Sequence, residues 1–186
     1  LSFWSSRMAE LQRDYRVSVF IFDYRGYGRS AGTPTVPGVL QDARAAAREF
    51  ARRVGIEESD LIVMGQSLGG AVAVQLAAEI QPRGLILEST FSSFRDVADH
   101  HAKWASWLVP RGKLDSQATS GQYRGPVLQC HGDADRVVPF ESGQKLFQAA
   151  NEPKTFITMP GGGHNSPLTK SYRWALDDFI AQLEPN

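Results

Sequence analysis

A serine, an aspartate and a histidine in this sequence have the residue types and the settings that nucleophilic catalysis requires. Ser67 lies in Gly65-Gln66-Ser67-Leu68-Gly69, which fits the pattern G-x-S-x-G, and Asp135 and His164 follow further along the chain. A serine hydroxyl is a poor nucleophile at neutral pH, so it needs a base to take its proton and a carboxylate to orient that base. The three types predict attack by Ser67 on a carbonyl carbon, with His164 as the base and Asp135 as its partner.

The residues around Ser67 predict a strand, a tight turn and a helix. Residues 61–64 form a short apolar run with the length of a buried strand, and residues 71–80 are almost wholly apolar at helix length. This order is the context that the motif needs, because its turn holds the serine in a strained conformation with the oxygen exposed. We expect Gly65 and Gly69 to leave room where a Cβ would collide with a neighbouring element. The helix N-terminus behind Ser67 offers N–H groups to a developing oxyanion.

Strand and helix patterns alternate along the whole chain, which implies an α/β fold with a mostly parallel sheet and helices on both faces. In such sheets ligands bind at the carboxyl ends of the strands. Ser67, Asp135 and His164 each follow a predicted strand, so we expect them to meet at one edge of the sheet. The strands are expected at residues 17–22, 61–64, 84–87, 126–130 and 155–159, and the helices at 1–15, 39–54, 71–80, 140–150 and 168–183.

Length and composition favour a single packed domain over residues 1–186. Hydrophobic residues make up 42% of the chain and the formal net charge is zero, which argues against disorder and against nucleic acid as a partner. No run of about 18 apolar residues is present, so no membrane span is expected. The single cysteine, Cys130, excludes an internal disulfide framework and a cysteine-cluster metal site. No metal-ligand spacing and no dinucleotide fingerprint follows any strand, so neither a metal nor a cofactor is expected.

Four stretches that together span nearly the whole chain carry a resemblance to the α/β-hydrolase superfamily. The sequence is similar to its single-domain group, which includes depalmitoylating thioesterases and S33-type, serine aminopeptidase-like hydrolases. The resemblance implies the α/β-hydrolase fold, with Ser67, Asp135 and His164 in that family's chain order. The matching stretches are FDYRGYGRS at residues 22–30, GQSLGG at 65–70, HGDADRVVP at 131–139 and GGH at 162–164.

The resemblance also implies a cofactor-free serine hydrolase that acts on a small-molecule ester or acyl substrate. We expect cleavage of carboxylic esters or thioesters through an acyl-enzyme on Ser67. A peptidase or amidase with the same triad is one alternative, and a non-catalytic scaffold of the same fold is another. The single cysteine favours a cytoplasmic location, with an upstream signal or membrane anchor as the alternative; the oligomeric state is left open.

Other polar residues compete for roles at this edge. Asp133 could reach the same space as Asp135, but the family pattern H-G-x-x-D-x-x-V-P matches Asp135, and Asp133 fits a turn-shaping role. His131 ends a strand and fits a structural role, and His100 and His101 fit exposed polar positions.

Three further polar residues fit positions at or near the predicted strand ends. Asp23 and Arg25 could bind substrate, but we favour a structural role in which Arg25 holds its loop through hydrogen bonds. Glu88 ends a strand near the expected site, where it could bond the loop that carries His164.

Acyl transfer also needs donors for the oxyanion, and the backbone N–H of Leu68 is expected to be one of them. The resemblance places the second donor in a loop before the first helix, and no segment here matches that loop. We therefore expect an N-terminally truncated fold, whose missing strand would lie between residues 17–22 and 61–64.

A less regular stretch at about residues 91–123 reads as a small cap above the sheet. It carries Trp104 and Trp107, which we expect to bind the acyl part of the substrate. Packing of the same side chains in the core is the alternative.

Overall fold

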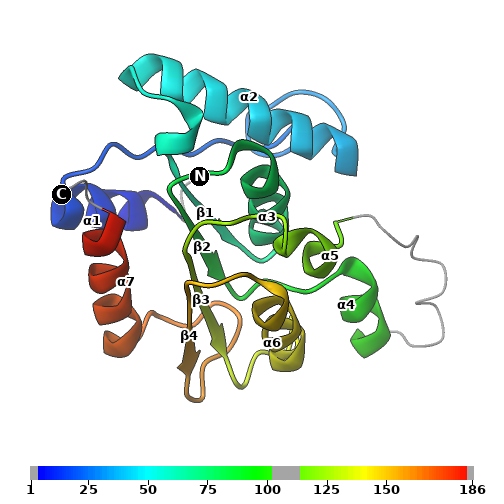
Figure 1. Cartoon of the computed structure of the whole chain (residues 1–186). Helices are drawn as coiled ribbons and strands as arrows, with labels where there is room; N and C mark the ends of the chain where they lie inside the picture. Colours follow the sequence, from blue (N-terminus) through cyan, green and yellow to red (C-terminus); the bar gives the residue numbers. More distant parts are fainter. Residues whose placement is uncertain (1–3, 102–113, 184–186) are drawn as a thin grey trace. The chain divides into compact units, whose positions relative to one another are not determined.

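The computed structural model describes residues 4–101 and 114–183 (Figure 1). It contains two compact units, Leu1–Gly55 and Ile56–Asn186. The expectation of a single domain over residues 1–186 stays a prediction. No helix among the described residues has both the length and the apolar character that crossing a membrane would need.

A four-stranded parallel sheet forms the centre of the second unit (Figure 1). Its order follows the sequence, so each strand lies beside the next one along the chain. The register places Gln66 opposite Glu88 and Gly132 opposite Met159, so the strands end together at one edge. The strands are β1 (Ile62–Gln66), β2 (Gly84–Glu88), β3 (Val127–Gly132) and β4 (Lys154–Met159), each within two residues of its predicted bounds.

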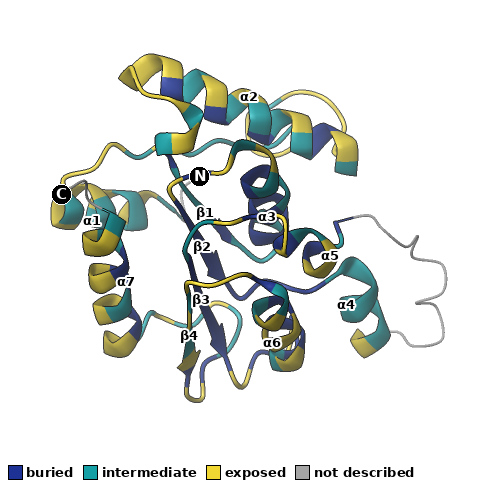
Figure 2. Cartoon of the chain, viewed as in Figure 1, coloured by how far each residue is buried: buried dark blue, intermediate teal, exposed yellow. Residues whose placement is uncertain are grey.

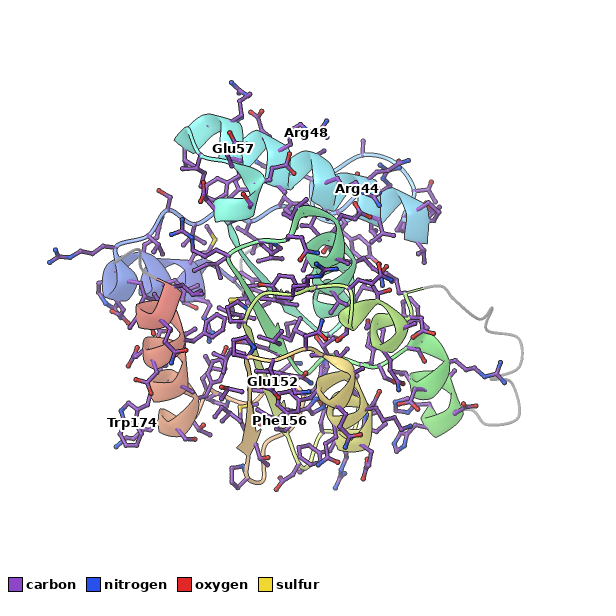
Figure 3. The ribbon with its side chains drawn as sticks, viewed as in Figure 1. Arg44, Arg48, Glu57, Glu152, Phe156 and Trp174 are labelled. Atoms are coloured by element: carbon purple, nitrogen blue, oxygen red, sulfur yellow. The ribbon has the colours of Figure 1, made fainter. Side chains whose placement is uncertain are left out.

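Helices cover both faces of this sheet, as the alternating pattern predicted (Figure 1). One face carries α3 (Leu68–Ile80) and α6 (Phe140–Ala149), and the other carries α7 (Lys170–Leu183). Burial on both faces explains why β2 and β3 are buried at every position and read as continuous apolar runs (Figure 2). On α7, Leu176 and Phe179 are buried, whereas Trp174 points outward with 66% of its surface exposed (Figure 3).

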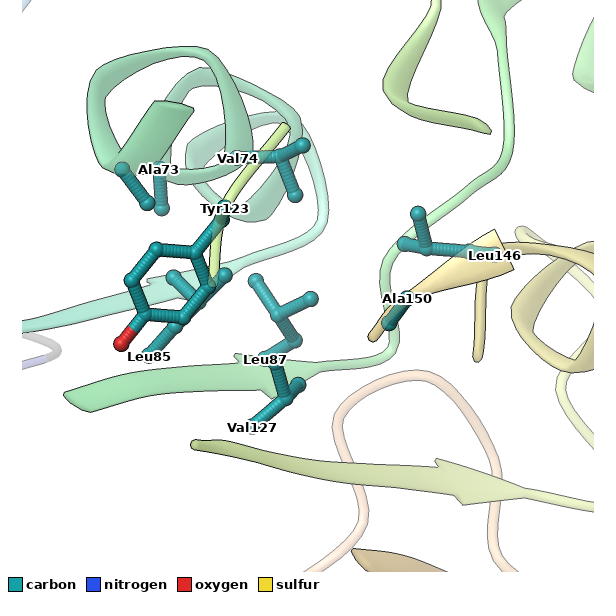
Figure 4. Packing of buried hydrophobic residues seen from close by; sticks show 9 residues of the cluster. Ala73, Val74, Leu85, Leu87, Tyr123, Val127, Leu146 and Ala150 are labelled. Carbon is teal, nitrogen blue, oxygen red and sulfur yellow. The ribbon is translucent and has the colours of Figure 1, made fainter. Parts of the chain in front are cut away.

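The core between α3, α6 and the sheet is apolar and contains one large aromatic residue, Tyr123 (Figure 4). Its hydroxyl donates to the carbonyl of Pro82 at 2.9 Å, so burial leaves this polar group paired. The buried members of the cluster are Ala73, Val74, Ala77, Leu85, Leu87, Tyr123, Val127, Leu146 and Ala150.

The described part of the excursion between β2 and β3, outside residues 102–113, contains two short helices where the sequence predicted a less regular chain. They are α4 (Phe94–His101) and α5 (Ser116–Ser120). Each begins at a polar residue that accepts a backbone N–H, since Ser93 Oγ accepts from Asp96 and Asp115 Oδ1 accepts from Ala118. Trp104 and Trp107 lie outside the described residues, so their role stays a prediction.

The first unit contains α1 (Ser5–Tyr15) and α2 (Val36–Val54). Thr35 caps α2, because its Oγ1 accepts from Gly38 N at 3.1 Å, and Gly55 ends the helix with φ of 75°. The guanidinium Nη2 of Arg25 lies 2.7 Å from Asp42 Oδ1, and Arg25 N donates to Asp42 Oδ2 at 2.9 Å. The structural role expected for Arg25 is therefore confirmed, because it fastens its loop to α2.

The strand expected at residues 17–22 is wrong, because this segment has no strand conformation in the described chain. A strand needs a hydrogen-bonded neighbour, and the described residues supply none for this segment. Its aromatic side chains stack instead, with the ring of Phe20 centred 5.3 Å from that of Phe50. In residues 17–22 the β-branched and aromatic side chains therefore serve side-chain packing and do not indicate pairing in a sheet.

Candidate active site

Ser67 occupies the sharp turn between β1 and α3, with φ of 52° and ψ of −120°. A positive φ at a residue with a Cβ is strained, and such strain persists only where the surroundings impose it. Ser67 N donates to Glu88 O at 3.0 Å, and Thr90 Oγ1 donates to Ser67 O at 3.3 Å. Glu88 at the end of β2 and Thr90 just after it therefore bond the backbone N–H and the carbonyl of Ser67, and hold the residue in its strained conformation.

Two glycines allow this turn to lie close to its neighbours. A Cβ on Gly65 would overlap the backbone of residues 69 and 70, which confirms the expected close approach at Gly65. A Cβ on Gly70 would overlap the side chain of Thr90. In the sequence, the only sign of this contact is the second glycine of the pair Gly69-Gly70.

Leu68 begins α3 directly after Ser67. The first N–H groups of a helix have no acceptor within the helix, and the helix dipole adds positive potential there. The backbone N–H of Leu68 therefore lies where a negative oxygen bound at Ser67 could be stabilised. The second donor, expected from an upstream loop, is not assigned to a described residue.

Asp135 and His164 come together at the same edge, after β3 and β4. His164 Nδ1 lies 2.8 Å from Asp135 Oδ2. Because an ionised carboxylate can only accept hydrogen bonds, Nδ1 is the donor in this pair. The other nitrogen, Nε2, is then the one that can accept a proton.

The Asp135 carboxylate is surrounded by donors. Burial by itself raises the pKa of Asp135, but hydrogen bonds from His131, His164 and two backbone N–H groups outweigh it and hold the pKa well below its usual range. The backbone donors are Val137 N and Val138 N, at 2.8 and 2.9 Å from Oδ1. Asp135 is therefore a fixed negative charge beside His164.

A direct link joins the turn at Ser67 to the loop at His164. Gln66 Nε2 donates to the carbonyl of His164 at 3.3 Å, so the residue before the serine holds the backbone of the histidine. The part of the chain that the structure describes has no hydrogen bond between Ser67 Oγ and the imidazole of His164. Catalytic hydrogen bonds are often long in ligand-free proteins and tighten with substrate bound.

The competing polar residues have other partners. Asp133 Oδ1 accepts from Gly161 N at 2.6 Å, so Asp133 shapes the loop that leads to His164. Glu88 Oε1 accepts from the hydroxyl of Tyr172 at 2.5 Å. His101 is exposed, as expected, and its Nε2 contacts the carbonyl of Val137 at 2.7 Å, beside the Asp135 loop. No sequence pattern marks Tyr172 or His101 for these contacts.

In the described ranges, no group of three histidine, cysteine, aspartate or glutamate side chains could hold a metal ion. The arrangement offers a hydroxyl, an imidazole and a carboxylate, which together suit nucleophilic attack on a carbonyl group.

A family model described as serine aminopeptidase, S33 matches residues 8–124, which is more than half of the chain. A protein of Mycobacterium tuberculosis is 38% identical over 164 residues, covering 87% of this chain and 58% of its own length. The human alpha/beta hydrolase domain-containing protein 17B is 34% identical over 168 residues, covering 89% of this chain and 57% of its own length. The chain therefore spans less than two thirds of these relatives.

A solved structure, the monoacylglycerol lipase of Paleococcus ferrophilus, superposes with a TM-score of 0.69. The match covers 98% of this chain and 88% of the lipase at 16% sequence identity. At that identity the likeness bears on the fold, and it agrees with a parallel sheet covered by helices on both faces.

Proposed function

Because this chain belongs to the serine aminopeptidase S33 family and has the α/β-hydrolase fold, we propose that it is part of a serine hydrolase that cleaves carboxylic esters or thioesters. The observation that carries the proposal is the 2.8 Å contact between His164 Nδ1 and Asp135 Oδ2, at the sheet edge where Ser67 occupies a strained turn. Strain of this kind clusters at active sites, where it aims a side chain.

In the proposed mechanism, Ser67 Oγ attacks the carbonyl carbon of the substrate while His164 Nε2 takes the hydroxyl proton. Asp135 fixes the orientation of the imidazole and stabilises the positive charge that forms on it. The Leu68 N–H donates to the oxyanion of the tetrahedral intermediate. His164 then gives its proton to the leaving alcohol or thiol, which leaves an acyl group on Ser67. A water molecule then attacks the acyl carbon while His164 Nε2 takes a proton from it. Cleavage of the bond between the acyl carbon and Ser67 Oγ releases the carboxylic acid, and His164 returns the proton to Oγ.

We favour esters and thioesters over amides as the proposed substrates for two reasons. Their leaving groups depart more readily than an amine, and the structurally similar Paleococcus ferrophilus protein is named a monoacylglycerol lipase. The acyl-binding role of Trp104 and Trp107 remains part of the proposal. Aminopeptidase activity is the second candidate, because the matching family carries that description and the same three residues can cleave amides.

Activity-based labelling tests the proposal. The protein encoded by the whole open reading frame that contains this chain is treated with a fluorophosphonate probe and assayed with p-nitrophenyl esters of different acyl length. We expect labelling and ester turnover in the native protein and neither in Ser67→Ala. The absence of labelling in a folded native protein, or labelling that survives Ser67→Ala, would contradict the proposal. Faster turnover of amino-acid p-nitroanilides than of the esters would favour the aminopeptidase instead.

A further inference from the structure

A second imidazole, that of His131, lies against the Asp135 carboxylate. His131 is in β3 and has no exposed surface. Its Nε2 lies 3.0 Å from the carbonyl oxygen of Val138 and 3.4 Å from Asp135 Oδ2. Both neighbours are acceptors, so Nε2 must carry the hydrogen.

The other nitrogen of this ring has no partner. His131 Nδ1 is fully buried and makes no hydrogen bond within residues 4–101 and 114–183. An unpaired buried polar atom costs free energy, so an apolar side chain of similar volume would serve better for packing alone. The imidazole is therefore best explained by what its Nε2–H does at Asp135.

Neighbours from α6 hold the ring in this orientation. The ring of Phe140 meets it edge-on, with centroids 5.8 Å apart and planes at 82°. Gly143 lies so close that a Cβ there would overlap His131 Nδ1. Glycine at residue 143 thus provides the space that the imidazole fills, and the hydrogen bond to Val138 O favours the orientation in which Nε2 faces Asp135.

Each oxygen of the Asp135 carboxylate has two of these contacts. Oδ1 accepts from two backbone N–H groups, and Oδ2 faces two imidazoles, those of His164 and His131. The Nε2–H of His131, with Nε2 at 3.4 Å from Oδ2, attracts negative charge that would otherwise act on His164. The titratable groups at this cluster, among the described residues, are Asp135, His164 and His131 itself, together with His101 of α4, whose Nε2 contacts Val137 O. Phe140 and Gly143 of α6 do not titrate.

We propose that His131 is a positioning residue of this site, whose Nε2 bonds Val138 O and lies 3.4 Å from Asp135 Oδ2, so that it fixes the carboxylate and sets how strongly His164 holds its proton. The inference rests on the proposed function, because it takes the Asp135–His164 pair as the acid–base pair of a hydrolase. It concerns a residue that does not touch the substrate and acts through Asp135.

Two substitutions separate hydrogen bonding from packing. His131→Leu removes the donor and keeps much of the volume, whereas His131→Gln places an amide nitrogen near the position of Nε2. In His131→Leu, more negative charge on Oδ2 stabilises the protonated form of His164. The acid limb of the pH profile of kcat/KM should therefore move upward by about half a pH unit, with kcat reduced about tenfold and KM little changed. His131→Gln should restore the position of the acid limb.

Phe140→Leu is the matched control, because it alters a packing contact of the same ring without removing a donor to Asp135. The control should leave the acid limb in place. An acid limb that stays fixed in His131→Leu, or that moves equally in Phe140→Leu, would show that His131 only fills space and would overturn the inference.

A measurement on the native protein covers the case in which His131→Leu does not fold. Nitrogen-15 NMR of labelled histidines should show a proton on Nε2 of His131 and none on Nδ1, and the opposite tautomer would overturn the inference. Fluorophosphonate labelling of the native protein separates the two proposals. No labelling contradicts the hydrolase, whereas labelling with the opposite His131 tautomer contradicts only the role of His131.

Discussion

Replacing Ser67 by glycine should make the protein more stable than replacing it by alanine. Ser67 has φ of 52° and ψ of −120°, a conformation that glycine adopts freely and that a residue with a Cβ adopts only under strain. Relief of such strain is worth about 1–3 kcal/mol. The extra freedom of glycine in the unfolded chain costs about 0.5–1 kcal/mol. The free energy of unfolding of Ser67→Gly should therefore exceed that of Ser67→Ala by about 1 kcal/mol, the difference between these effects.

Both variants lack the hydroxyl, so the comparison isolates the backbone. Urea denaturation followed by circular dichroism measures the two free energies, and about 1 kcal/mol corresponds to about 2–4 °C in the melting temperature of a chain of this size. Gln144 provides the control, because it is exposed in the middle of α6 of the same unit. There Gln144→Gly should be less stable than Gln144→Ala by about 1 kcal/mol, the usual order in a helix.

The difference in unfolding free energy between the glycine and alanine variants should have opposite signs at residues 67 and 144. If glycine is less stable than alanine at residue 67 as well, the turn stores no strain that a Cβ creates, and the argument from φ and ψ fails. If both Ser67 variants have the stability of the native protein, the strain is too small to matter for aiming the hydroxyl.

Two other perturbations address the surroundings of the site. Gly70→Ala should lower the free energy of unfolding, measured by urea denaturation, by about 1–3 kcal/mol, because the new Cβ overlaps Thr90. Adding Thr90→Ala should restore part of this loss. If the double variant shows no recovery beyond the effect of Thr90→Ala alone, the overlap with Thr90 is not the cause. The second perturbation is acid. The pKa of Asp135 in the folded protein lies below its unfolded value of about 3.9, so its contribution to stability is complete above about pH 4 and is lost as the pH falls toward the folded pKa. Unfolding free energies measured between about pH 2 and 5 should therefore fall less steeply in Asp135→Asn than in the native protein, and equal slopes would argue against this carboxylate.

The four strands of the sheet were predicted from sequence because their burial leaves a direct trace in composition. Residues in β2 and β3 are covered on both faces, so they read as apolar runs of strand length. The same reasoning placed Asp135 and His164 at one edge, and the structure brings them into contact. Parallel topology fixes which strand ends meet, so the nearness of the two residues follows from element order, whereas their hydrogen bond also depends on side-chain direction. The resemblance to α/β-hydrolases is confirmed by the matching family and by the fold.

Features that depend on a partner in space could not be predicted in this way. Residues 17–22 have the composition of a strand, but composition does not reveal whether a neighbouring strand is available to pair with them. The short helices of the excursion are fixed by caps at Ser93 and Asp115, which are too local to stand out in a periodicity analysis.

Polar networks were the least accessible from sequence. Glu88 and Tyr172 lie 84 residues apart and meet through a hydrogen bond that no spacing rule anticipates. His131 was read as a structural histidine, and only the distances show that its Nε2 faces Asp135. Side-chain direction decides such contacts, and direction depends on the packing of α6 and β3 together.

The two ends of the excursion between β2 and β3 are held by hydrogen bonds to each other and to neighbouring helices. Gln117 N donates to Ser92 O at 2.9 Å, and Ser92 N donates in turn to Ser142 Oγ at 3.0 Å on α6. On the other side, Gln75 Nε2 of α3 donates to Thr119 Oγ1 at 2.9 Å. Both ends of the insertion are therefore fastened to the helical layer, independently of Ser67 and His164. We therefore expect the stretch between these fastened ends to tolerate changes of length and composition while Ser67, Asp135 and His164 keep their places.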